Sequence, residues 1–273
     1  YSYLFVNPKA GLTWRLSEQN SLYASVAVAN REPVRSDFID APQGREPLPE
    51  SLRDLEAGWR YRGDRFRAEA SYYFMDYDNQ LVLNGELNDV GASVRQNVKD
   101  SYRTGLEAVA TYDAGKRWFV SVNAALSRNK IRRFEEYLYN YDPYEVEVIV
   151  HENTDISFSP ALVAGTTLTF RPVADLELSL LGKYVSRQYL DNTRNAGRSL
   201  DPFFVSDLRL NWTLRPAWAR EIRIGLIVNN LLNAQYEPNG YTFSYKLGSD
   251  LFTENYYYPQ AGTNWIGSVA LRF

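Results

Sequence analysis

The sequence contains no cysteine, one histidine and one methionine. The absence of cysteine excludes a disulfide scaffold, an iron–sulfur protein and a thiol enzyme. A histidine-based zinc site needs more than one such ligand, and His151 is the single candidate base for a serine hydrolase. We therefore expect no catalysis, no resident metal ion and no cofactor.

Long hydrophobic runs are also missing. No stretch of eighteen apolar residues exists, which excludes a transmembrane helix. A β-barrel crosses a bilayer with alternating segments of about ten residues, which leave no such run. The net charge of -3 gives no basic surplus for nucleic acid, so we expect no nucleic-acid partner. At 273 residues, the chain has room for one large all-β domain or two ordinary domains.

Alternation of apolar and polar residues is what the sequence has in abundance. The terminal stretch "TNWIGSVALRF" places Trp265, Val269 and Phe273 on one face and Ser268 and Arg272 on the other. A period of two is typical of a strand with one apolar face. Eleven segments alternate in this way: 10–16, 22–28, 55–61, 66–74, 106–112, 118–126, 162–170, 176–180, 208–214, 222–228 and 265–273.

The connections between these segments alternate in length. Short turns lie at 17–20, 62–65, 113–117, 171–175 and 215–221, and long connections lie near 31–50, 82–101, 129–157, 187–201 and 231–263. Tight periplasmic turns and long external loops are typical of an outer-membrane barrel. A soluble β-sandwich also alternates, but several structureless loops of this length count against a compact domain.

The tryptophans give a second indication of a membrane barrel. Five of the six lie in or near a short turn, joined there by other aromatic residues: Trp14, Trp59, Trp118, Trp212 and Trp218, with Tyr61, Phe66, Tyr112 and Phe170. Amphipathic rings settle where hydrocarbon meets head groups. The pattern predicts a periplasmic aromatic girdle, with Trp265 nearer the outer one and the apolar face of each strand against outer-membrane lipid.

An odd number of strands predicts that more of the protein exists. If Phe273 lies at the periplasmic boundary, the eleventh and the first segments both run inward. Single-chain bacterial barrels have even strand numbers, and an open sheet edge leaves backbone groups unpaired in lipid. We therefore expect these 273 residues to be a portion of a longer chain.

Several motifs resemble a known family in the order in which they occur. They are "NPKAGLTWRLSEQNSLYASVAVANREPV", "LPESLRDLEAGWRYRGDRFRAEASYYFMDYDNQLVL", "YRTGLEAVATY", "LIVNNLLNAQYEPNGY" and "YYYPQAGTNWIGSVALRF". Together they resemble the C-terminal barrel half of TonB-dependent outer-membrane transporters, over nearly the whole chain. The resemblance implies an all-β transmembrane antiparallel barrel of 22 strands around a plug. Residues 1–273 would be the last eleven strands, with the plug domain and the N-terminal strands outside this chain.

The resemblance also implies a function. Members of this family take up scarce, large nutrients such as a ferric siderophore, haem, cobalamin or an oligosaccharide, and iron complexes are the commonest of these. The implied partners are a TonB complex acting through the region before the barrel, the protein's own plug domain and the nutrient ligand. The implied location is the outer membrane of a Gram-negative bacterium, crossed many times.

Tyrosines in the external loops are candidate ligand contacts. The segment 134–151, "FEEYLYNYDPYEVEVIVH", carries Tyr137, Tyr139, Tyr141 and Tyr144, and "ENYYYPQ" carries Tyr257 between two other tyrosines. A tyrosine ring offers rigid area and a hydrogen-bonding tip. The alternatives are that the first four rings extend a hairpin above the membrane and pack on neighbouring loops, and that the second group belongs to an outer aromatic girdle.

Charged residues supply two further predictions. Arg31 and Arg35, near Asp37, begin a long loop and are candidates for an anionic ligand such as a carboxylate-bearing chelate. Ordinary ion pairing within the loop is the alternative.

Eight charged residues on the polar faces of the strands predict a mixed-sign lumen wall: Glu56, Arg60, Arg67, Glu69, Glu107, Asp207, Arg209 and Arg223. In a plugged barrel they would contact the plug, and in an open pore they would set ion selectivity. Two alternatives to a transporter therefore stay open, a porin-like barrel without an energised step and a soluble β-sandwich binding module.

Overall fold

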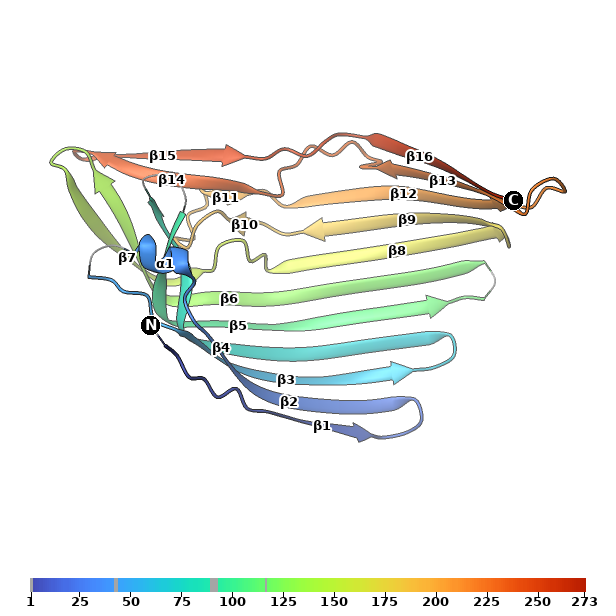
Figure 1. The fold of residues 1–273 in the computed structure, drawn as a ribbon, viewed down its shortest axis with the longest axis horizontal. Helices are drawn as coiled ribbons and strands as arrows, with labels where there is room; N and C mark the ends of the chain where they lie inside the picture. The colour runs from blue at the N-terminus through green and yellow to red at the C-terminus, as the bar shows by residue number, and fades with distance from the viewer. Residues whose placement is uncertain (1, 42–43, 89–92, 116) are drawn as a thin grey trace.

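In the computed structural model, which describes residues 2–41, 44–88, 93–115 and 117–273, eleven strands follow one another in one antiparallel sheet (Figure 1). The order along the sheet is β1 (Lys9–Arg15), β2 (Asn20–Arg31), β3 (Glu50–Arg62), β4 (Phe66–Leu87), β5 (Ser93–Asp113), β6 (Trp118–Asn140), β8 (Leu162–Val173), β9 (Leu176–Val185), β12 (Phe203–Leu214), β13 (Glu221–Asn229) and β16 (Asn264–Arg272). All eleven predicted segments are thus strands, and β1 and β16 form the edges. A single continuous sheet contradicts the β-sandwich alternative.

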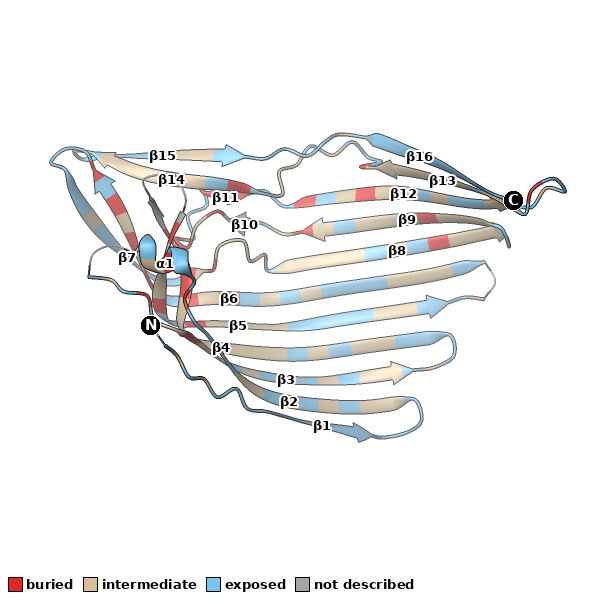
Figure 2. Ribbon diagram, in the orientation of Figure 1, coloured by how far each residue is buried: buried red, intermediate tan, exposed pale blue. Residues whose placement is uncertain are grey.

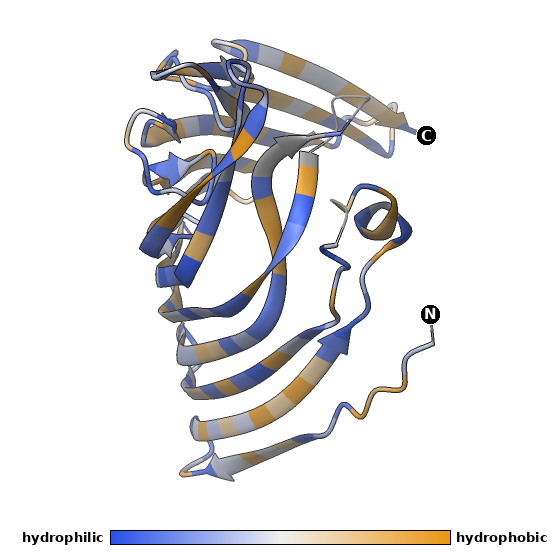
Figure 3. Cartoon of the chain, turned by 90° about the vertical axis from the view of Figure 1, so that its left-hand side faces the viewer, coloured by the Kyte–Doolittle hydropathy of each residue, from blue (hydrophilic) through white to orange (hydrophobic). Residues whose placement is uncertain are grey.

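The sheet curves into a trough when it is viewed from its loop end (Figure 3). The predicted short turns gather at the opposite end, together with the C-terminus (Figure 1). Arg272 of β16 pairs with Glu221 of β13, directly after the last short turn. The predicted alternation of short turns and long connections is confirmed.

The long connections are more structured than predicted. β6 continues to Asn140 and turns into β7 (Glu145–Asp155), while the region predicted as the last long connection contains β14 (Gly240–Leu247) and β15 (Asp250–Tyr257). The connection near 187–201 contains the short strands β10 (Gln188–Tyr189) and β11 (Ser199–Leu200), and α1 (Arg35–Ile39) follows β2. Part of the predicted connection at 82–101 belongs to β4 and β5, and its residues 89–92 lie outside the described residues.

The apolar face of the sheet is exposed. Leu12 and Trp14 of β1 are 73% and 64% exposed, and Leu126 of β6 is 57% exposed. Exposed apolar area of this extent marks a surface that contacts a partner protein or a membrane. No helix among the described residues is both long and apolar enough to span a membrane.

Aromatic residues cluster at the turn end of this face. The Trp59 ring lies 6.2 Å from the Tyr61 ring, which lies 5.7 Å from the Phe66 ring across the turn. Trp118 and Phe170 stack with ring centroids 4.4 Å apart. The predicted grouping of tryptophans with other aromatics at the short turns is therefore present in the structure.

The inward face is polar and closely fitted. Tyr23 of β2 lies opposite Gly58 of β3, and a Cβ atom at Gly58 would come within 2.5 Å of the tyrosine ring. The Tyr23 ring in turn carries the guanidinium of Arg60 at 4.1 Å. Glycine at this position leaves room for the ring, which crosses directly over the neighbouring backbone.

The buried core lies mainly at the loop end, not in the middle of the sheet (Figure 2). One apolar cluster joins the loop-end parts of β4, β5 and β6 to the chain after β7. It consists of Val82, Val98, Ile131, Phe134 and Ile156. A strand that crosses lipid needs no core of its own, whereas loops in water need one to hold a fixed shape. The loop end is therefore an organised structure in its own right.

Candidate functional site at the loop end of the sheet

Arg198 is the charged centre of the loop end. Its side chain is 4% exposed, although it lies in the connection between β10 and β11. Nη1 donates to Glu136 of β6 and, at 2.9 Å, to Asp191, while Nη2 donates to Thr253 of β15 at 3.4 Å. One guanidinium thus joins the connection to two hairpins that are far apart in sequence.

The carboxylates around Arg198 compensate for the effect of burial on its guanidinium. Burial lowers the pKa of this guanidinium, but the hydrogen bond and the charge of Glu136, with those of Asp191, outweigh it and raise the pKa overall. Glu136 also contacts His151, with Oε2 2.8 Å from Nε2. Arg198 therefore stays charged, and Glu136 has partners on both carboxylate oxygens.

Neutral hydrogen bonds bind the same connection to its surroundings. Asn192 is fully buried, donates to the carbonyl of Leu83 at 2.7 Å and accepts from the amide of Ser157 at 2.8 Å. Asn255 of β15 donates to the carbonyl of Gly197 at 2.7 Å. We call residues 187–201 the hub, because they contact β4, β6, β15 and the chain after β7.

The β6–β7 and β14–β15 hairpins also meet at their tips. Asn140 donates to the carbonyl of Gly248 at 3.0 Å and accepts from its amide at 3.0 Å. Lys246 lies 2.5 Å from Glu147, and a short parallel pairing joins Tyr245 to Tyr139. We call this contact the tip junction. The hub and the tip junction thus join the two hairpins at two separate points.

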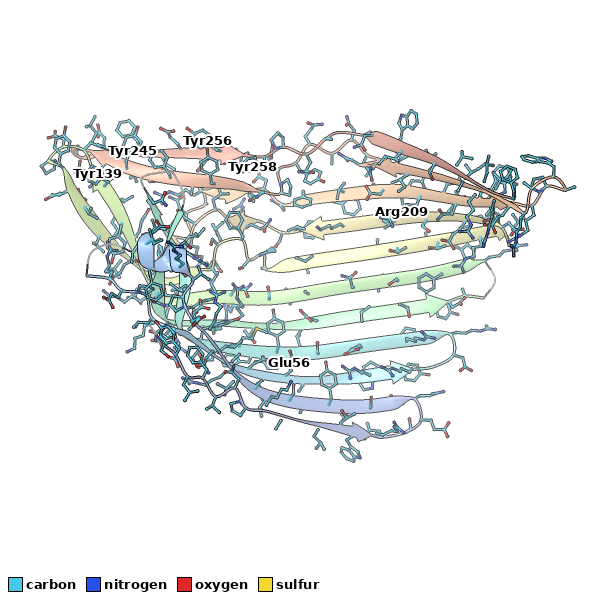
Figure 4. The ribbon with its side chains drawn as sticks, viewed as in Figure 1. Glu56, Tyr139, Arg209, Tyr245, Tyr256 and Tyr258 are labelled. Atoms are coloured by element: carbon cyan, nitrogen blue, oxygen red, sulfur yellow. The ribbon has the colours of Figure 1, made fainter. Side chains whose placement is uncertain are left out.

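Aromatic rings line both hairpins (Figure 4). Tyr141 lies 4.7 Å from Tyr139 and 5.7 Å from Tyr245, and Tyr245 stacks on Phe252 at 5.3 Å. Further along β14 and β15, the Tyr241 and Tyr256 rings stack at 4.8 Å, and Tyr258 lies 6.2 Å from Tyr241. The rings therefore form two clusters, one at the tips of the hairpins and one further along β14 and β15.

A hollow of about 480 Å³ lies beside the β6–β7 hairpin, where the chain before β3 packs on β5. We call it the basic hollow, because Arg45, Arg95, Lys99 and Arg133 line it along with Tyr137. Arg45 stacks on the Tyr137 ring at 3.8 Å. Three acids, Glu46, Asp100 and Glu135, also line it. Arginine beside tyrosine suits a planar or anionic guest.

Glu135 is tied into the wall of the basic hollow. Hydrogen bonds from Arg133 at 3.1 Å and from Tyr137 at 3.0 Å lower the pKa of its carboxyl group. The carboxylate is therefore ionised at neutral pH and orients the Tyr137 hydroxyl. These hydrogen bonds hold the side chains of Glu135 and Tyr137 in place in the wall.

Of the two predicted loop arginines, Arg31 is engaged and Arg35 is exposed. Arg31 lies 2.8 Å from the carboxylate of Glu50, which also accepts from the Leu81 amide. Arg35 begins α1, two residues before the buried Asp37. Asp37 pairs with Arg95 of the basic hollow at 2.8 Å. The structure thus links the predicted 31–37 region to the hollow through Asp37 and not through the two predicted arginines.

The five candidate tyrosines do not form one site. Tyr137 lines the basic hollow, whereas Tyr139 and Tyr141 belong to the tip junction. Tyr144 stands exposed in the β6–β7 turn with a φ angle of 70°. Tyr257 pairs with Gly240, on the opposite face of β15 from Tyr256. Their predicted role in ligand contact stays a prediction.

The predicted lumen-wall residues lie on the polar face of the strands, and Glu56 and Arg209 mark it on β3 and β12 (Figure 4). Arg60 pairs with Glu69 at 2.8 Å, Arg223 pairs with Glu221, and Asp207 accepts from the Asn230 amide at 2.9 Å. The remaining two members of the set are exposed, Arg67 and Glu107.

A second hollow of about 520 Å³ touches this wall near the loop end. Glu56, Glu107 and Arg103 line it, and Arg103 donates to Ser159 of the chain after β7 at 2.9 Å. The wall thus presents free carboxylates and paired charges to whatever occupies the trough. The residues that the structure describes contain no cluster of acids and histidine arranged to hold a metal ion.

Sequence reasoning missed the hub and most of the basic hollow. Arg198, Glu136 and Asp191 are ordinary charged residues in a long connection, and nothing local marks them as partners. Arg45, Arg95 and Lys99 likewise come together only because the chain before β3 folds over β5. Only Tyr137 of the basic hollow carried a signal, through the density of tyrosines around it.

Comparison with known proteins identifies a family for most of this chain. A family model described as "TonB dependent receptor-like, beta-barrel" matches residues 1–231. The comparison with curated proteins gives no match.

Three solved structures share the fold at low identity. They are a ferric citrate transporter, FecA, in its unliganded form (TM-score 0.73, 20% identity), the siderophore receptor PiuA from Acinetobacter baumannii (0.71, 16%) and the copper transporter OprC (0.70, 21%). They cover 97–98% of this chain. In turn, the chain spans 35–39% of the length of those proteins.

Proposed function

Because this chain belongs to the TonB-dependent receptor β-barrel family, we propose that it forms part of an outer-membrane active transporter for a scarce nutrient. The proposed cargo is an iron complex, either a ferric siderophore or haem. In this proposal the exposed apolar face contacts outer-membrane lipid, the trough holds a plug domain, and the loop end faces the outside of a Gram-negative cell. A TonB complex supplies the energy through a region that is not in this chain.

The basic hollow is the observation that carries the proposal. It combines four cationic side chains with an oriented tyrosine, and it lies at the loop end, where a ligand from outside would arrive first. Loops held on a rigid scaffold are the usual place for recognition. Arginine and tyrosine together suit a chelate that carries carboxylate or phenolate oxygens.

The polar inner wall is an argument for the proposed plug domain. Glu56 and Glu107 offer carboxylates to the trough, and paired groups such as Arg60 and Glu69 keep the wall polar without a large net charge. A plug with basic residues at matching positions would neutralise the free carboxylates. The tyrosines at 139, 141, 144 and 257 are proposed as secondary ligand contacts outside the basic hollow, and Arg31 and Arg35 as contacts at the start of the loop before β3.

The test is uptake by cells that carry the full-length protein. Cells are given a panel of radiolabelled ferric siderophores and haem, with and without dissipation of the proton-motive force. We expect uptake of one complex that stops when the force is removed. Uptake that persists unchanged would identify a passive, porin-like barrel instead.

A charge-reversal pair tests the site itself. Lys99→Glu with Arg133→Glu reverses two exposed cations of the basic hollow, so the concentration that half-saturates uptake is expected to rise at least tenfold, about 1.4 kcal/mol. Arg15→Glu, at the turn end of β1, is the matched control and should leave uptake unchanged. Equal half-saturation in both variants would show that the basic hollow does not hold the ligand.

A further inference from the structure

The chain contains two Asn-Gly dipeptides, and the fold gives them different surroundings. Asn84 lies within β4, before Gly85, and its side chain is fully buried. Asn239 lies where the connection after β13 enters β14, before Gly240, and it is exposed. In such a pair the amide nitrogen of the glycine can attack the asparagine side chain, because glycine has no side chain to obstruct the approach. The two dipeptides therefore differ in access and not in chemistry.

The amide of Gly240 is aimed at the side chain of Asn239. It donates to Oδ1 of Asn239 at 2.9 Å, which places the nitrogen beside the carbon of the side-chain amide. The Tyr258 amide donates to the Asn239 carbonyl at 3.0 Å. In an antiparallel ladder, hydrogen-bonded pairs alternate with pairs that are not hydrogen-bonded. Gly240 and Tyr257, the next pair, therefore form no ladder bond, and the Gly240 amide points away from β15.

The hydrogen bond from Tyr258 also favours the reaction. When the Gly240 amide loses its proton, the negative charge is shared with the Asn239 carbonyl oxygen through the peptide resonance. The Tyr258 amide lies 3.0 Å from the carbonyl oxygen and stabilises the charge as it develops. Position and charge stabilisation thus both favour attack at Asn239.

We propose that Asn239 is a site of spontaneous deamidation in the folded protein, whereas burial protects Asn84. The Gly240 nitrogen forms a bond to Cγ of Asn239, the bond from Cγ to Nδ2 breaks, and ammonia leaves with the proton of the Gly240 amide. Water then opens the resulting succinimide ring at either carbonyl carbon, which gives aspartate or isoaspartate. The two steps together are a hydrolysis, and water is the only co-reactant.

The isoaspartate product changes the hairpin that follows it. Its main chain runs through the former side chain, and the carbonyl that accepts from Tyr258 becomes part of a free carboxylate. Gly240 is buried, and a Cβ atom there would lie 3.3 Å from Cδ2 of Leu190 in the hub. A position packed this closely has no room for an additional main-chain atom. Isoaspartate therefore loosens the β14–β15 hairpin from the hub, whereas aspartate only adds a charge at the surface.

The test incubates the full-length protein in detergent at mildly alkaline pH, and peptide mass spectrometry follows deamidation at both asparagines. In the folded protein, Asn239 is expected to react about tenfold faster than Asn84 or more. In urea both dipeptides are accessible, so the two rates should converge. Equal rates at the two asparagines of the folded protein, or protection of both, would overturn the proposal.

Two variants separate the altered main chain from the added charge. In Asn239→Gln the ring that must close is larger, so deamidation at this position should stop. Asn239→Asp carries the charge on an ordinary main chain, and before incubation it should show the hydrogen exchange of fresh parent protein. Parent protein that has formed isoaspartate should exchange faster over residues 240–258, and Asn239→Gln after the same incubation should not. Unchanged exchange in parent protein that contains isoaspartate would refute the loosening. Neither measurement needs transport.

Discussion

Arg198 and Glu136 lie 62 residues apart in the chain and contact each other at the buried centre of the loop end. Glu136 belongs to the β6–β7 hairpin, and Arg198 also reaches Thr253 of the β14–β15 hairpin. The shape of the loop end therefore depends on a buried charge that is paired with two carboxylates, those of Glu136 and Asp191. Such a charge is costly to leave without its partners.

Arg198→Met should loosen the hub without unfolding the sheet. The change leaves Glu136 and Asp191 buried without their shared cation, which costs about 3–5 kcal/mol. Hydrogen exchange should accelerate in peptides covering 134–151 and 187–201 and stay slow in the strands below. Arg194→Ala, in the same connection but exposed and paired with Asp155, should cost only about 0–1 kcal/mol. Equal protection in both variants would contradict a central role for Arg198.

Asn140→Asp should separate the tip junction. The change keeps the acceptor oxygen but removes the donors to Glu147 and Gly248, and it places two carboxylates together. The cost of the lost hydrogen bonds is about 1–3 kcal/mol. The chain has no cysteine, so spin labels on cysteines introduced at Tyr144 and Ser249 report the tip distance directly. A distance distribution that matches the parent protein would rule the prediction out.

Acid should open the same junction. Hydrogen bonds from Lys246 and then from Asn140 lower the pKa of Glu147 below its ordinary value of 4.5. A carboxyl group with a lowered folded-state pKa stabilises the junction above 4.5 and loses that contribution as the pH falls through the lowered value. The labelled tips should therefore stay together at neutral pH and separate only in acid, as the pH falls below the ordinary value of 4.5. Glu147→Gln should remove this pH dependence, and its persistence there would assign the titration to another group.

Gly58→Ala should destabilise the sheet through one identifiable clash. The added methyl group would lie 2.5 Å from the Tyr23 ring, and overpacking of this kind costs about 1–3 kcal/mol. The midpoint of urea unfolding in detergent should fall, and adding Tyr23→Ser should recover part of the loss. Ala57→Val, the preceding residue on the outward face, should change stability by no more than about 0.5 kcal/mol. The prediction fails if the double variant is less stable than Gly58→Ala alone.

The strands could be predicted because their signal is local. Alternation between neighbours predicted segments such as 118–126, and short turns follow β3 at 63–65 and β8 at 174–175, inside the predicted ranges 62–65 and 171–175. The β6–β7 hairpin appeared only as the alternative for segment 134–151, and the β14–β15 hairpin was missed, because the alternation of both also suits other structures. In β7 valines alternate with glutamates, and in β14 tyrosines alternate with threonine and serine, which also suits a polar loop.

The hub could not be predicted because its information is not local. Arg198 has no neighbour in sequence that distinguishes it from Arg194, and only the folded chain brings Glu136 and Thr253 to it. Arg31 and Arg35 are not among the residues that line the basic hollow. The residue of that region which reaches the hollow's wall is Asp37, through Arg95.

The tip junction has a consequence for the order of assembly. Asn140 and Gly248 are 108 residues apart, and β8, β9, β12 and β13 lie between them in the chain. Contacts of such long sequence separation form late, because the cost of closing the intervening loop falls only once those strands are paired. Closure of the two tips therefore requires that the strands between them have already paired in the correct order, and a chain with one of these strands misplaced would keep its tips apart.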